Sequence, residues 1–465
     1  MKTLILAGGS GTRLFPLSRS HFPKQYLQYF DGESLFQKTV RRALLTSDPD
    51  EIAVVTSNAH RFLAADQMAG IGMKGRILVE PTAKSTLPAV LFGVNSLMDG
   101  DEDTRVAVLP SDHLIEEGDA YIHALKRAEH LSQDHLVAFG IVPSSPHTGY
   151  GYIQPAEEVP GGYRVGRFTE KPDQETAQQF IADGCFWNAG MFLFSAHLLF
   201  SECRRCSPDV AAAFERPVDE AYRLTPAISI DYGLMERTDH AAVVPLPCMW
   251  SDVGSFDALS TVLPSDSNGN TVHGEYLGID GKNNLVFSNR LVATIGVSEM
   301  AIVDTRDVLL VCPKAEAQRV GEVVNTLRAE GDGRCDLHTT VYRPWGSYSV
   351  LEEGPSFCIK RITVLPGRRL SLQLHHHRSE HWVVVRGTAL VSNNGETSFI
   401  RPGESTYVPA GVRHRLENPG IIPLEVIEVQ NGEHITEDDI VRFEDDFSRK
   451  EPERKPVVLS SYVAQ

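Results

Sequence analysis

The sequence lacks any long uninterrupted hydrophobic run. No stretch approaches the roughly 20 consecutive apolar residues that a membrane-spanning helix requires, so we expect no membrane partner. The opening segment, MKTLILAGGSG, reaches glycines too early for a signal peptide and lacks a following cleavage site of small residues. We therefore interpret it as a buried first strand.

The sequence also has few cysteines, and they do not form a regular pattern. The seven cysteines are scattered along 465 residues, and their odd number argues against a disulfide framework. Cys203 and Cys206 form a C-x-x-C pattern, but a structural zinc site would need a second such pair. We expect the two to share one helix face in a reducing cytoplasm; a redox or metal role is the alternative.

Basic residues are in deficit. The 44 Lys and Arg residues face 61 Asp and Glu residues, which gives a formal charge of −17. This balance excludes a nucleic-acid partner, because such a protein needs a basic contact surface. A chain of this length exceeds one hydrophobic core, so we expect two or three domains.

Alternating strand and helix patterns in the first 260 residues indicate an α/β domain. Short apolar runs that end in polar or turn residues predict buried parallel strands over 3–7, 52–57, 76–80, 106–112 and 136–140. Between the first two, Ser34 and Gln37 form a capping-box pattern that starts a helix. Its predicted buried face holds Phe36, Val40, Ala43 and Leu44. The ligand crevice of such a sheet lies beyond the carboxyl ends of its strands.

The remainder of the chain is predominantly β. A polar, turn-rich segment at 264–274 is a plausible linker, and short β runs follow it, with one helix over 315–329. From about residue 340 the pattern is all-β. We thus predict domains over 1–262, 263–335 and 336–465. On architecture alone we expect a homo-oligomer, a dimer, with the β connector as its interface.

A glycine-rich loop follows the first strand. Gly8, Gly9 and Gly11 let backbone amides approach an anionic ligand. The dinucleotide fingerprint fails because Leu14 stands where a third glycine is needed, and the Walker pattern fails as well. A tight turn is therefore as good an explanation of this loop as a binding site.

Charged residues elsewhere in this half suit a nucleotide triphosphate. Arg13 and Lys24 are cations close to the loop, and Asp112 and Asp252 are carboxylates suited to Mg²⁺. The segment FTEKPD adds Glu170 and Lys171. Each feature alone has an ordinary surface or strand-end explanation.

Together and in this order, the segments resemble the sugar-nucleotide pyrophosphorylases, particularly the mannose-1-phosphate guanylyltransferases. The resemblance covers essentially all of residues 1–260. It is carried by LAGGSGTRLFPLSR, PKQ, EPTAKSTLPA, LPSDH, GYGYI, FTEKPD, WNAGMF, SIDYGLME and WSDVGSF. It implies a Rossmann-like nucleotidyltransferase domain with a mixed, mostly parallel sheet, which binds GTP and mannose 1-phosphate and forms GDP-mannose and pyrophosphate.

The resemblance also implies roles for individual residues. Lys24 neutralises the reacting phosphates, and Glu80 accepts hydrogen bonds from guanine. The implied catalytic residues of the transfer are Arg13, Lys24 and Lys171. The implied nucleotide-binding residues are Gly8, Gly9, Gly11, Arg13, Glu80 and Asp112. The implied Mg²⁺ ligands are Asp112 and Asp252, and the implied sugar-phosphate residues are Gly149, Glu170, Lys171 and Asn188. Many relatives carry Arg-Asn where this chain has Lys84 and Ser85, so neither receives a base contact.

Three consecutive histidines occur in the all-β part, in LQLHHHRSEHWVVVRG. Strand alternation predicts that Gln373, His375 and His377 share one face and His376 the other. Clustered histidines at a turn are often merely solvated. Here, however, two spacings resemble the two cupin motifs, with Gln373 in place of the usual first histidine. The first spacing runs over Gly367, Gln373, His375, Glu380 and Gly387, and the second runs over Gly403, Pro409, Gly411, His414 and Asn418.

The cupin resemblance implies a small jelly-roll barrel with a metal site at Gln373, His375, Glu380 and His414. Such ligands suit a divalent transition metal such as Zn²⁺. A pyrophosphorylase followed by a cupin resembles the bifunctional enzymes that are also type II mannose-6-phosphate isomerases, which interconvert fructose 6-phosphate and mannose 6-phosphate.

For that second activity, Arg415 is the residue that the resemblance ties to isomerisation. Arg413 is expected to be an exposed arginine, and His381 and Glu417 are candidates for the base that moves the proton. Two alternatives remain: a guanylyltransferase with a structural or sensory cupin, and an oxidoreductase built on the α/β domain, against which the missing third glycine counts.

Overall fold

The computed structural model describes residues 1–9 and 11–446. The chain divides into two compact units, Met1–Leu337 and a second that begins at His338. Residues 447–465 of the expected third domain lie outside the described residues.

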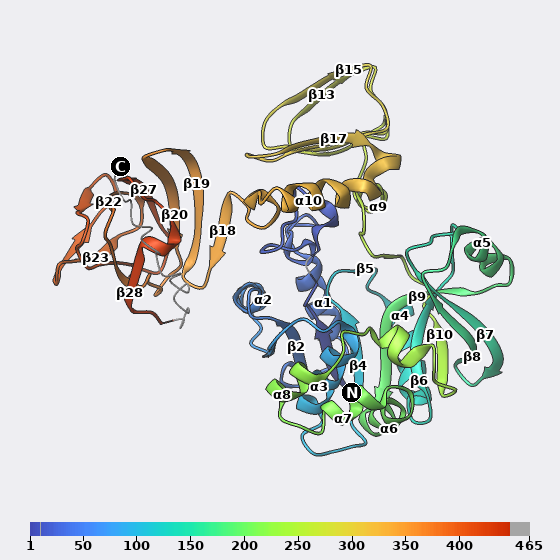
Figure 1. The fold of residues 1–465 in the computed structure, drawn as a ribbon. Coiled ribbons are helices and arrows are strands. Elements are labelled where there is room, and N and C mark those ends of the chain that lie inside the picture. The colour runs from blue at the N-terminus through green and yellow to red at the C-terminus, as the bar shows by residue number, and fades with distance from the viewer. Residues whose placement is uncertain (10, 447–465) are drawn as a thin grey trace, which may run out of the picture. The chain divides into compact units, whose positions relative to one another are not determined.

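Within the described part of the first unit, nine strands form one mixed sheet (Figure 1). In spatial order they are β3 (Arg76–Glu80), β2 (Ile52–Ser57), β1 (Lys2–Leu6), β4 (Arg105–Pro110), β9 (Phe186–Ser195), β6 (Leu136–Ile141), β10 (Ala241–Pro245), β8 (Gly162–Glu170) and β7 (Gly151–Val159). Every predicted apolar run is a strand. Only β8 and β9 run against the common direction of this sheet, so the expected mixed, mostly parallel sheet is confirmed.

Helices cover both faces of this sheet. One face packs against α1 (Leu35–Ala43), α2 (Arg61–Gly70), α4 (Asp119–Leu131) and α5 (Gln174–Ala182). The other face packs against α3 (Thr86–Leu97), α6 (Ala196–Cys206) and α7 (Pro208–Ala213), with α8 (Val218–Leu224) and the π-helix η4 (Asp231–Met235) close by. Cys203 and Cys206 lie on α6 as free, buried thiols, which confirms the helix-face prediction.

Helix α1 begins as its sequence predicts. The Ser34 side chain accepts a hydrogen bond from the Gln37 amide, and the Gln37 side chain accepts one from the Ser34 amide. Phe36, Val40 and Ala43 are buried, but the prediction for Leu44 is wrong. Leu44 is the C-cap residue and is 38% exposed, because the helix ends before the residue that would continue its apolar face.

The predicted β connector is a stack of short parallel strands (Figure 1). Its elements are β12 (Thr271–His273), β13 (Tyr276–Ile279), β14 (Leu285–Phe287), β15 (Val292–Ile295), β16 (Met300–Asp304), the antiparallel β17 (Leu309–Pro313), the 3₁₀ helix η5 (Lys314–Arg319), α10 (Val320–Ala329) and η6 (Gly333–Cys335). The predicted helix over 315–329 corresponds to η5 and α10.

The connector shares a hydrophobic core with the segment after the glycine loop. Leu14 and Phe15 pack in one cluster with Leu285, Phe287 and Val324. Arg19, fully buried at its side chain, forms an ion pair of 3.0 Å with Asp307. The loop is therefore supported from behind by the connector.

Short elements complete the first unit. They are η1 (Thr12–Leu14), η2 (Lys24–Tyr26), η3 (Pro49–Glu51), the paired strands β5 (Leu114–Ile115) and β11 (Trp250–Ser251), and α9 (Phe256–Val262).

The second unit is a sandwich of two antiparallel sheets over its described residues. One sheet contains β18 (Thr340–Arg343), β19 (Gly346–Gly354), β20 (Phe357–Val364), β27 (Leu424–Gly432), β22 (Arg378–Arg386) and β25 (Ser405–Val408). The other contains β24 (Glu396–Ile400), β23 (Ala389–Asn393), β26 (His414–Glu417), β21 (Leu372–His375) and β28 (Ile440–Glu444), which follows η7 (Glu437–Asp439). Trp345, Trp382 and Leu416 lie in the core between them.

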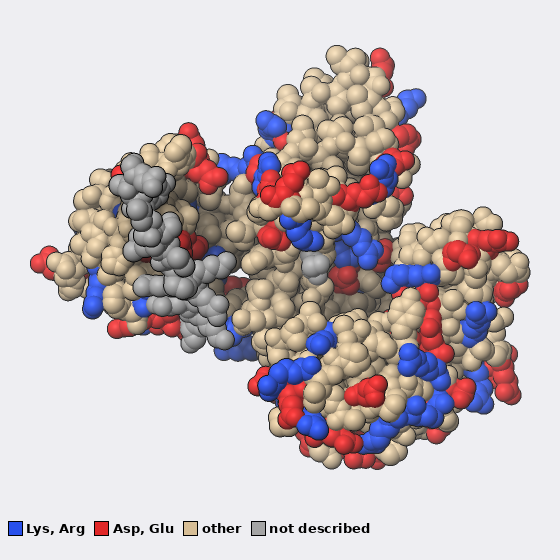
Figure 2. Space-filling model, in the orientation of Figure 1, with Lys and Arg blue, Asp and Glu red and all other residues tan. Residues whose placement is uncertain are grey.

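Among the described helices, none is long and apolar enough to cross a bilayer. On the face drawn in Figure 2, Lys and Arg side chains are interspersed with Asp and Glu side chains.

Candidate functional site

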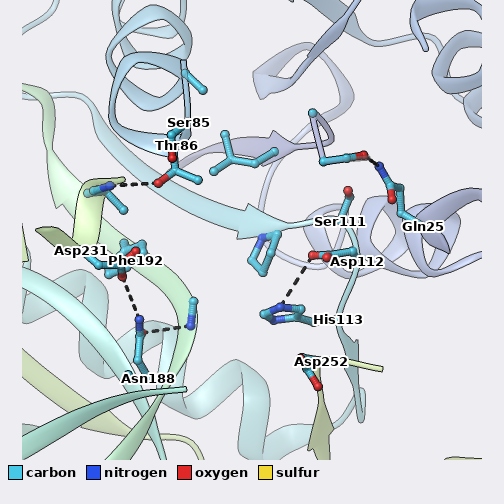
Figure 3. Close-up of a pocket in the computed structure, with 18 of the residues that line it drawn as sticks. Gln25, Ser85, Thr86, Ser111, Asp112, His113, Asn188, Phe192, Asp231 and Asp252 are labelled. Atoms are coloured by element: carbon cyan, nitrogen blue, oxygen red, sulfur yellow. Dashed lines mark hydrogen bonds and ion pairs between the residues drawn. The ribbon is translucent and has the colours of Figure 1, made fainter. Parts of the chain in front are cut away.

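A cavity of about 500 Å³ opens beyond the carboxyl ends of β1, β3 and β4 in the first unit (Figure 3). Its position is the one that the α/β pattern predicts. The predicted site residues that line it are Gly8, Gly9, Arg13, Glu80, Asp112, Gly149, Glu170, Lys171, Asn188 and Asp252. Segments far apart in sequence thus converge on one space.

Lys24 and Gly11 are not among the residues that line this cavity, but they support it. The Lys24 ammonium lies 3.1 Å from a carboxylate oxygen of Asp112 and also bonds the main-chain oxygen of Asp252. Gly11 has φ +52°, and a Cβ there would lie 2.7 Å from the Lys24 amide nitrogen. A glycine is needed at this position because a side chain would displace the backbone that carries Lys24.

The two predicted Mg²⁺ ligands, Asp112 and Asp252, lie together at the charged end of the cavity. Loss of hydration would raise the pKa of Asp112, but the charges of Lys24 and His113 lower it to about 2. The Tyr150 hydroxyl donates to Asp252 at 2.8 Å, and the Arg13 guanidinium lies 3.9 Å from the same carboxylate. Asp112, His113 and Asp252 lie together in Figure 3. Two neighbouring carboxylates, each beside a cation, have the chemistry of a Mg²⁺ site.

His113 and Tyr150 were missed as functional candidates. Both occur in motifs that carry the resemblance, LPSDH and GYGYI, but a single histidine or tyrosine has no spacing that marks it. Their position becomes visible only when β4 and β7 are brought to the same cavity.

Glu80 ends β3 and faces the glycine loop. Its carboxylate accepts a hydrogen bond of 3.0 Å from Tyr222, and its side chain is 8% exposed. Burial raises the pKa of Glu80 to about 7, although the Tyr222 bond opposes the shift. A Cβ on Gly8 would lie 3.1 Å from a Glu80 oxygen, so a larger residue there would crowd this carboxylate.

The opposite end of the cavity is lined by polar groups. Asn188 donates to Asp231 at 3.0 Å and accepts from the Gly190 amide, as Figure 3 shows. Lys171 pairs with Glu170 at 2.8 Å. Burial, followed by the charge of Glu170, raises the pKa of Asp231 to about 6. Asp231 was not predicted, since SIDYGLME gives it no distinguishing spacing.

Lys84 and Ser85 also line the cavity. Ser85 has φ +68° and precedes α3, and the Thr86 hydroxyl accepts a hydrogen bond of 2.9 Å from the Ile230 amide. Lys84 and Ser85, which received no base contact from the sequence, therefore lie at the cavity wall.

In the second unit, the predicted cupin ligands converge. His375, Glu380 and His414 each offer a ligand atom within 4.8 Å of the others, and all three are buried. Gln373 pairs in register with His414, and its side-chain amide lies 3.4 Å from His375 Nε2. Four residues from β21, β22 and β26 thus lie around one point.

The donor atoms of this group fit a metal ion. His414 Nδ1 lies 2.9 Å from the Val412 carbonyl, which fixes its proton there and leaves Nε2 as a lone-pair donor. Nε2 of His414 and Oε2 of Glu380 are buried without a hydrogen-bond partner among the described residues. Burial lowers the pKa of His414, so the imidazole is neutral, as a metal ligand requires.

Other predicted residues of this unit lie elsewhere. Arg415 follows His414 on β26, faces the other side of that sheet and pairs with Glu444 at 2.7 Å. His381 is exposed on β22, and Glu417 lies 4.0 Å from Arg369. Arg413 is exposed and stacks on Phe443, as expected of a surface arginine.

The strand-alternation prediction for His377 is wrong. Strand β21 ends at His375, so alternation does not continue. His377 is exposed and bonds Asp439 at 2.8 Å through Nδ1.

The first unit has the fold and cavity of a nucleotidyltransferase, and the second is a cupin with a buried group of metal-binding side chains. Three family models match consecutive parts of the chain. Residues 2–268 match "Nucleotidyl transferase", 274–327 match "MannoseP isomerase/GMP-like beta-helix domain", and 330–445 match "Mannose-6-phosphate isomerase C-terminal".

Curated relatives match along their whole length. The xanthan biosynthesis protein XanB of Xanthomonas campestris is 44% identical over 96% of this chain and 98% of its own. The alginate biosynthesis protein AlgA of Pseudomonas aeruginosa is 41% identical over 99% and 100%. The mannose-1-phosphate guanylyltransferase ManC of Salmonella typhimurium is 40% identical over 96% and 98%.

A solved structure agrees with these matches. A protein of Thermus thermophilus, titled mannose-1-phosphate geranyltransferase, is 35% identical, with a TM-score of 0.66 over 70% of this chain and 99% of its own. The chain therefore belongs to the nucleotidyl transferase family, among the members that also carry the mannose-6-phosphate isomerase C-terminal domain. The family and the fold expected from the sequence are confirmed.

Proposed function

We propose that this chain is a mannose-1-phosphate guanylyltransferase whose second unit isomerises fructose 6-phosphate and mannose 6-phosphate. The first activity transfers GMP from GTP to mannose 1-phosphate and gives GDP-mannose and pyrophosphate. The observation that carries it is the cavity at the carboxyl edge of the sheet, with Lys24 bonded to both Asp112 and Asp252 and with Lys171 among its lining residues.

The transfer needs positioning and charge neutralisation more than covalent chemistry. A phosphate oxygen of mannose 1-phosphate attacks the α-phosphorus of GTP, and pyrophosphate leaves. Arg13 and Lys24 stabilise the triphosphate, Lys171 holds the phosphate of mannose 1-phosphate, and Glu170 and Asn188 line the pocket for its sugar. Mg²⁺ at Asp112 and Asp252 would supply further neutralisation of the phosphate oxygens.

Guanine selection is assigned to Glu80. A carboxylate at the end of β3 accepts hydrogen bonds from two guanine donors, N1–H and the 2-amino group, which adenine does not present. Tyr222 holds the carboxylate in place.

The isomerase proposal rests on the buried group of Gln373, His375, Glu380 and His414. A transition metal such as Zn²⁺ held there would polarise the substrate oxygens as a Lewis acid. Glu380 Oε2 and His414 Nε2, which lie 3.6 Å apart and have no hydrogen-bond partner in the described chain, support a cupin that binds a metal, since a core without a ligand would satisfy them internally. The base that moves the proton is left unassigned.

The deciding experiment assays purified full-length protein with GTP, ATP, CTP or UTP against mannose 1-phosphate, beside fructose 6-phosphate isomerisation with and without chelator. We expect a preference for GTP and a chelator-sensitive isomerisation. Asp112→Asn should abolish transfer and spare isomerisation; retained transfer would remove Asp112 from the site. Isomerisation that is absent in metal-loaded protein would leave a guanylyltransferase with a structural or sensory cupin.

We further propose that the protein works in the cytoplasm as a homodimer, with the β connector as its interface. The connector presents exposed apolar side chains, among them Leu277, Ile279 and Ile295. Light scattering of Ile279→Lys tests this, since a charge at a true interface should yield monomers.

A further inference from the structure

A second cavity lies between the two sheets of the cupin unit, next to the candidate metal group. Gln373 and Glu380 line it, and so do four cationic side chains from four different strands. The cations are Arg343, Lys360, Arg378 and Arg442. The sequence pattern did not indicate a functional role for Arg343, Lys360 or Arg442.

The register of the strands places these groups on the inner face. Lys360 on β20 pairs with Glu428 on β27, which pairs in turn with the buried Trp382 on β22. Arg442 on β28 pairs with Gln373 on β21. Because cross-strand partners point to the same side of a sheet, Lys360 and Arg442 project from opposite sheets into the space between.

Two of these cations lack a carboxylate partner. Arg343 and Lys360 form no ion pair among the described residues; instead they lie 5.7 Å and 5.1 Å from the ring centre of Tyr348. Glu428, the cross-strand partner of Lys360, uses its oxygens for Trp382 at 3.1 Å and Gln430 at 3.0 Å. Glu380, Glu428 and Glu437 also line this cavity, but Glu380 pairs with Arg378 and Glu437 with Arg442, so Arg343 and Lys360 remain available to a ligand.

Arg442 adds a buried donor. Its side chain is 11% exposed, and although its terminal nitrogen pairs with Glu437 at 3.2 Å, its Nε is buried without a partner in the described chain. A buried N–H that finds no protein acceptor costs free energy unless a ligand supplies one.

We infer that Arg343, Lys360 and Arg442 form the binding site for the phosphate group of the hexose 6-phosphate. The inference rests on the proposed isomerase function and defines how its substrate lies. A phosphate dianion matches two or three convergent cationic donors, and the metal group that shares the cavity receives the carbonyl end, C1 and C2. The cavity therefore selects for a phosphate at the end of the sugar remote from the carbonyl.

The test compares Lys360→Gln and Arg442→Gln with Arg386→Gln in metal-loaded full-length protein. Arg386 is a matched control, since it lies in the same unit on β22, is 58% exposed at its side chain and pairs with Glu425 on the surface. Losing one charge-assisted hydrogen bond should raise the KM for fructose 6-phosphate about ten- to hundredfold, with kcat within about threefold. Inorganic phosphate should compete with fructose 6-phosphate in the unchanged protein and much more weakly in both variants.

The outcomes separate the subsite from the activity. A fall in kcat with unchanged KM and unchanged phosphate inhibition would overturn the subsite, and so would an equal effect of Arg386→Gln. Metal content of the same samples, measured by elemental analysis, reports whether the cupin unit of each variant is folded. If the unchanged protein shows no isomerisation, the proposed activity fails on its own. Calorimetry with inorganic phosphate then tests the subsite, with GDP-mannose filling the cavity of the first unit. Phosphate binding that is lost in Arg442→Gln supports the subsite, and an absence of phosphate binding to the unchanged protein overturns it.

Discussion

Replacing Glu80 by glutamine tests the guanine assignment most directly. The Glu80 carboxylate is buried, and its pKa of about 7 lies close to working pH. If only the ionised form accepts both guanine hydrogen bonds, the competent fraction falls from about 90% at pH 8 to about 10% at pH 6. The KM for GTP should then rise about tenfold on lowering the pH from 8 to 6.

Glu80→Gln should remove both the affinity and its pH dependence. The amide keeps one acceptor and presents a donor to a base edge that itself donates, so about 1.5 to 3 kcal/mol of binding is lost. This corresponds to a KM for GTP raised about ten- to hundredfold at pH 8, with a flat profile down to pH 6. Steady-state guanylyltransferase assays across this range measure it, with the exposed Glu157→Gln as control. A profile that stays steep in Glu80→Gln would refute the assignment.

The same substitution should stabilise the protein at high pH. Because folding raises the pKa of Glu80 from 4.5 to about 7, the folded state binds the proton more tightly. The free energy of unfolding therefore falls as pH rises from 4.5 to 7, by at most about 3 kcal/mol. Glu80→Gln escapes this loss, so its melting temperature should exceed that of the unchanged protein at pH 8 but not near pH 4.5. An unchanged difference at the two pH values would mean that folding does not raise the pKa of Glu80.

Three further predictions concern other residues. Gly11→Ala should cost roughly 1 to 2 kcal/mol of stability and lower transfer activity, because the left-handed backbone disfavours alanine and its Cβ meets the Lys24 amide; thermal melts and transfer assays show whether it does. Asn188→Ala should raise the KM for mannose 1-phosphate while leaving that for GTP within about twofold, since Asn188 lies with Asp231 at the sugar end; equal changes in both values would place it elsewhere. His375→Ala should abolish isomerisation and metal retention, measured by elemental analysis, without changing guanylyl transfer; retained metal would exclude His375 as a ligand.

The sequence predicted the strands and the two ligand-bearing regions well, because both depend on local patterns. Period-two and continuous apolar runs located the parallel strands, and the spacing of Gln373, His375, Glu380 and His414 located a group that meets in space. Errors fell at element ends. Leu44 and His377 both lie just beyond the last residue of a regular element, where periodicity no longer determines the direction of a side chain.

Residues that act through long-range packing were not predictable. Asp231, His113 and Tyr150 reach the first cavity only through the order of the strands, and Lys360 and Arg442 reach the second through cross-strand register. None has a neighbour in sequence that marks it. Arg415, by contrast, stands beside the candidate ligand His414 in sequence, yet strand alternation turns it to the opposite face.

The core that joins Leu14 and Phe15 to Leu285, Phe287 and Val324 bears on how such enzymes exchange parts. A chimaera joined at residue 268, where the nucleotidyl transferase match ends, would lose the connector residues that pack behind the glycine loop. It would also leave Arg19 without its ion-pair partner Asp307. A cut after Leu337 keeps both, so recombination between relatives should succeed when residues 1–337 travel as a single cassette.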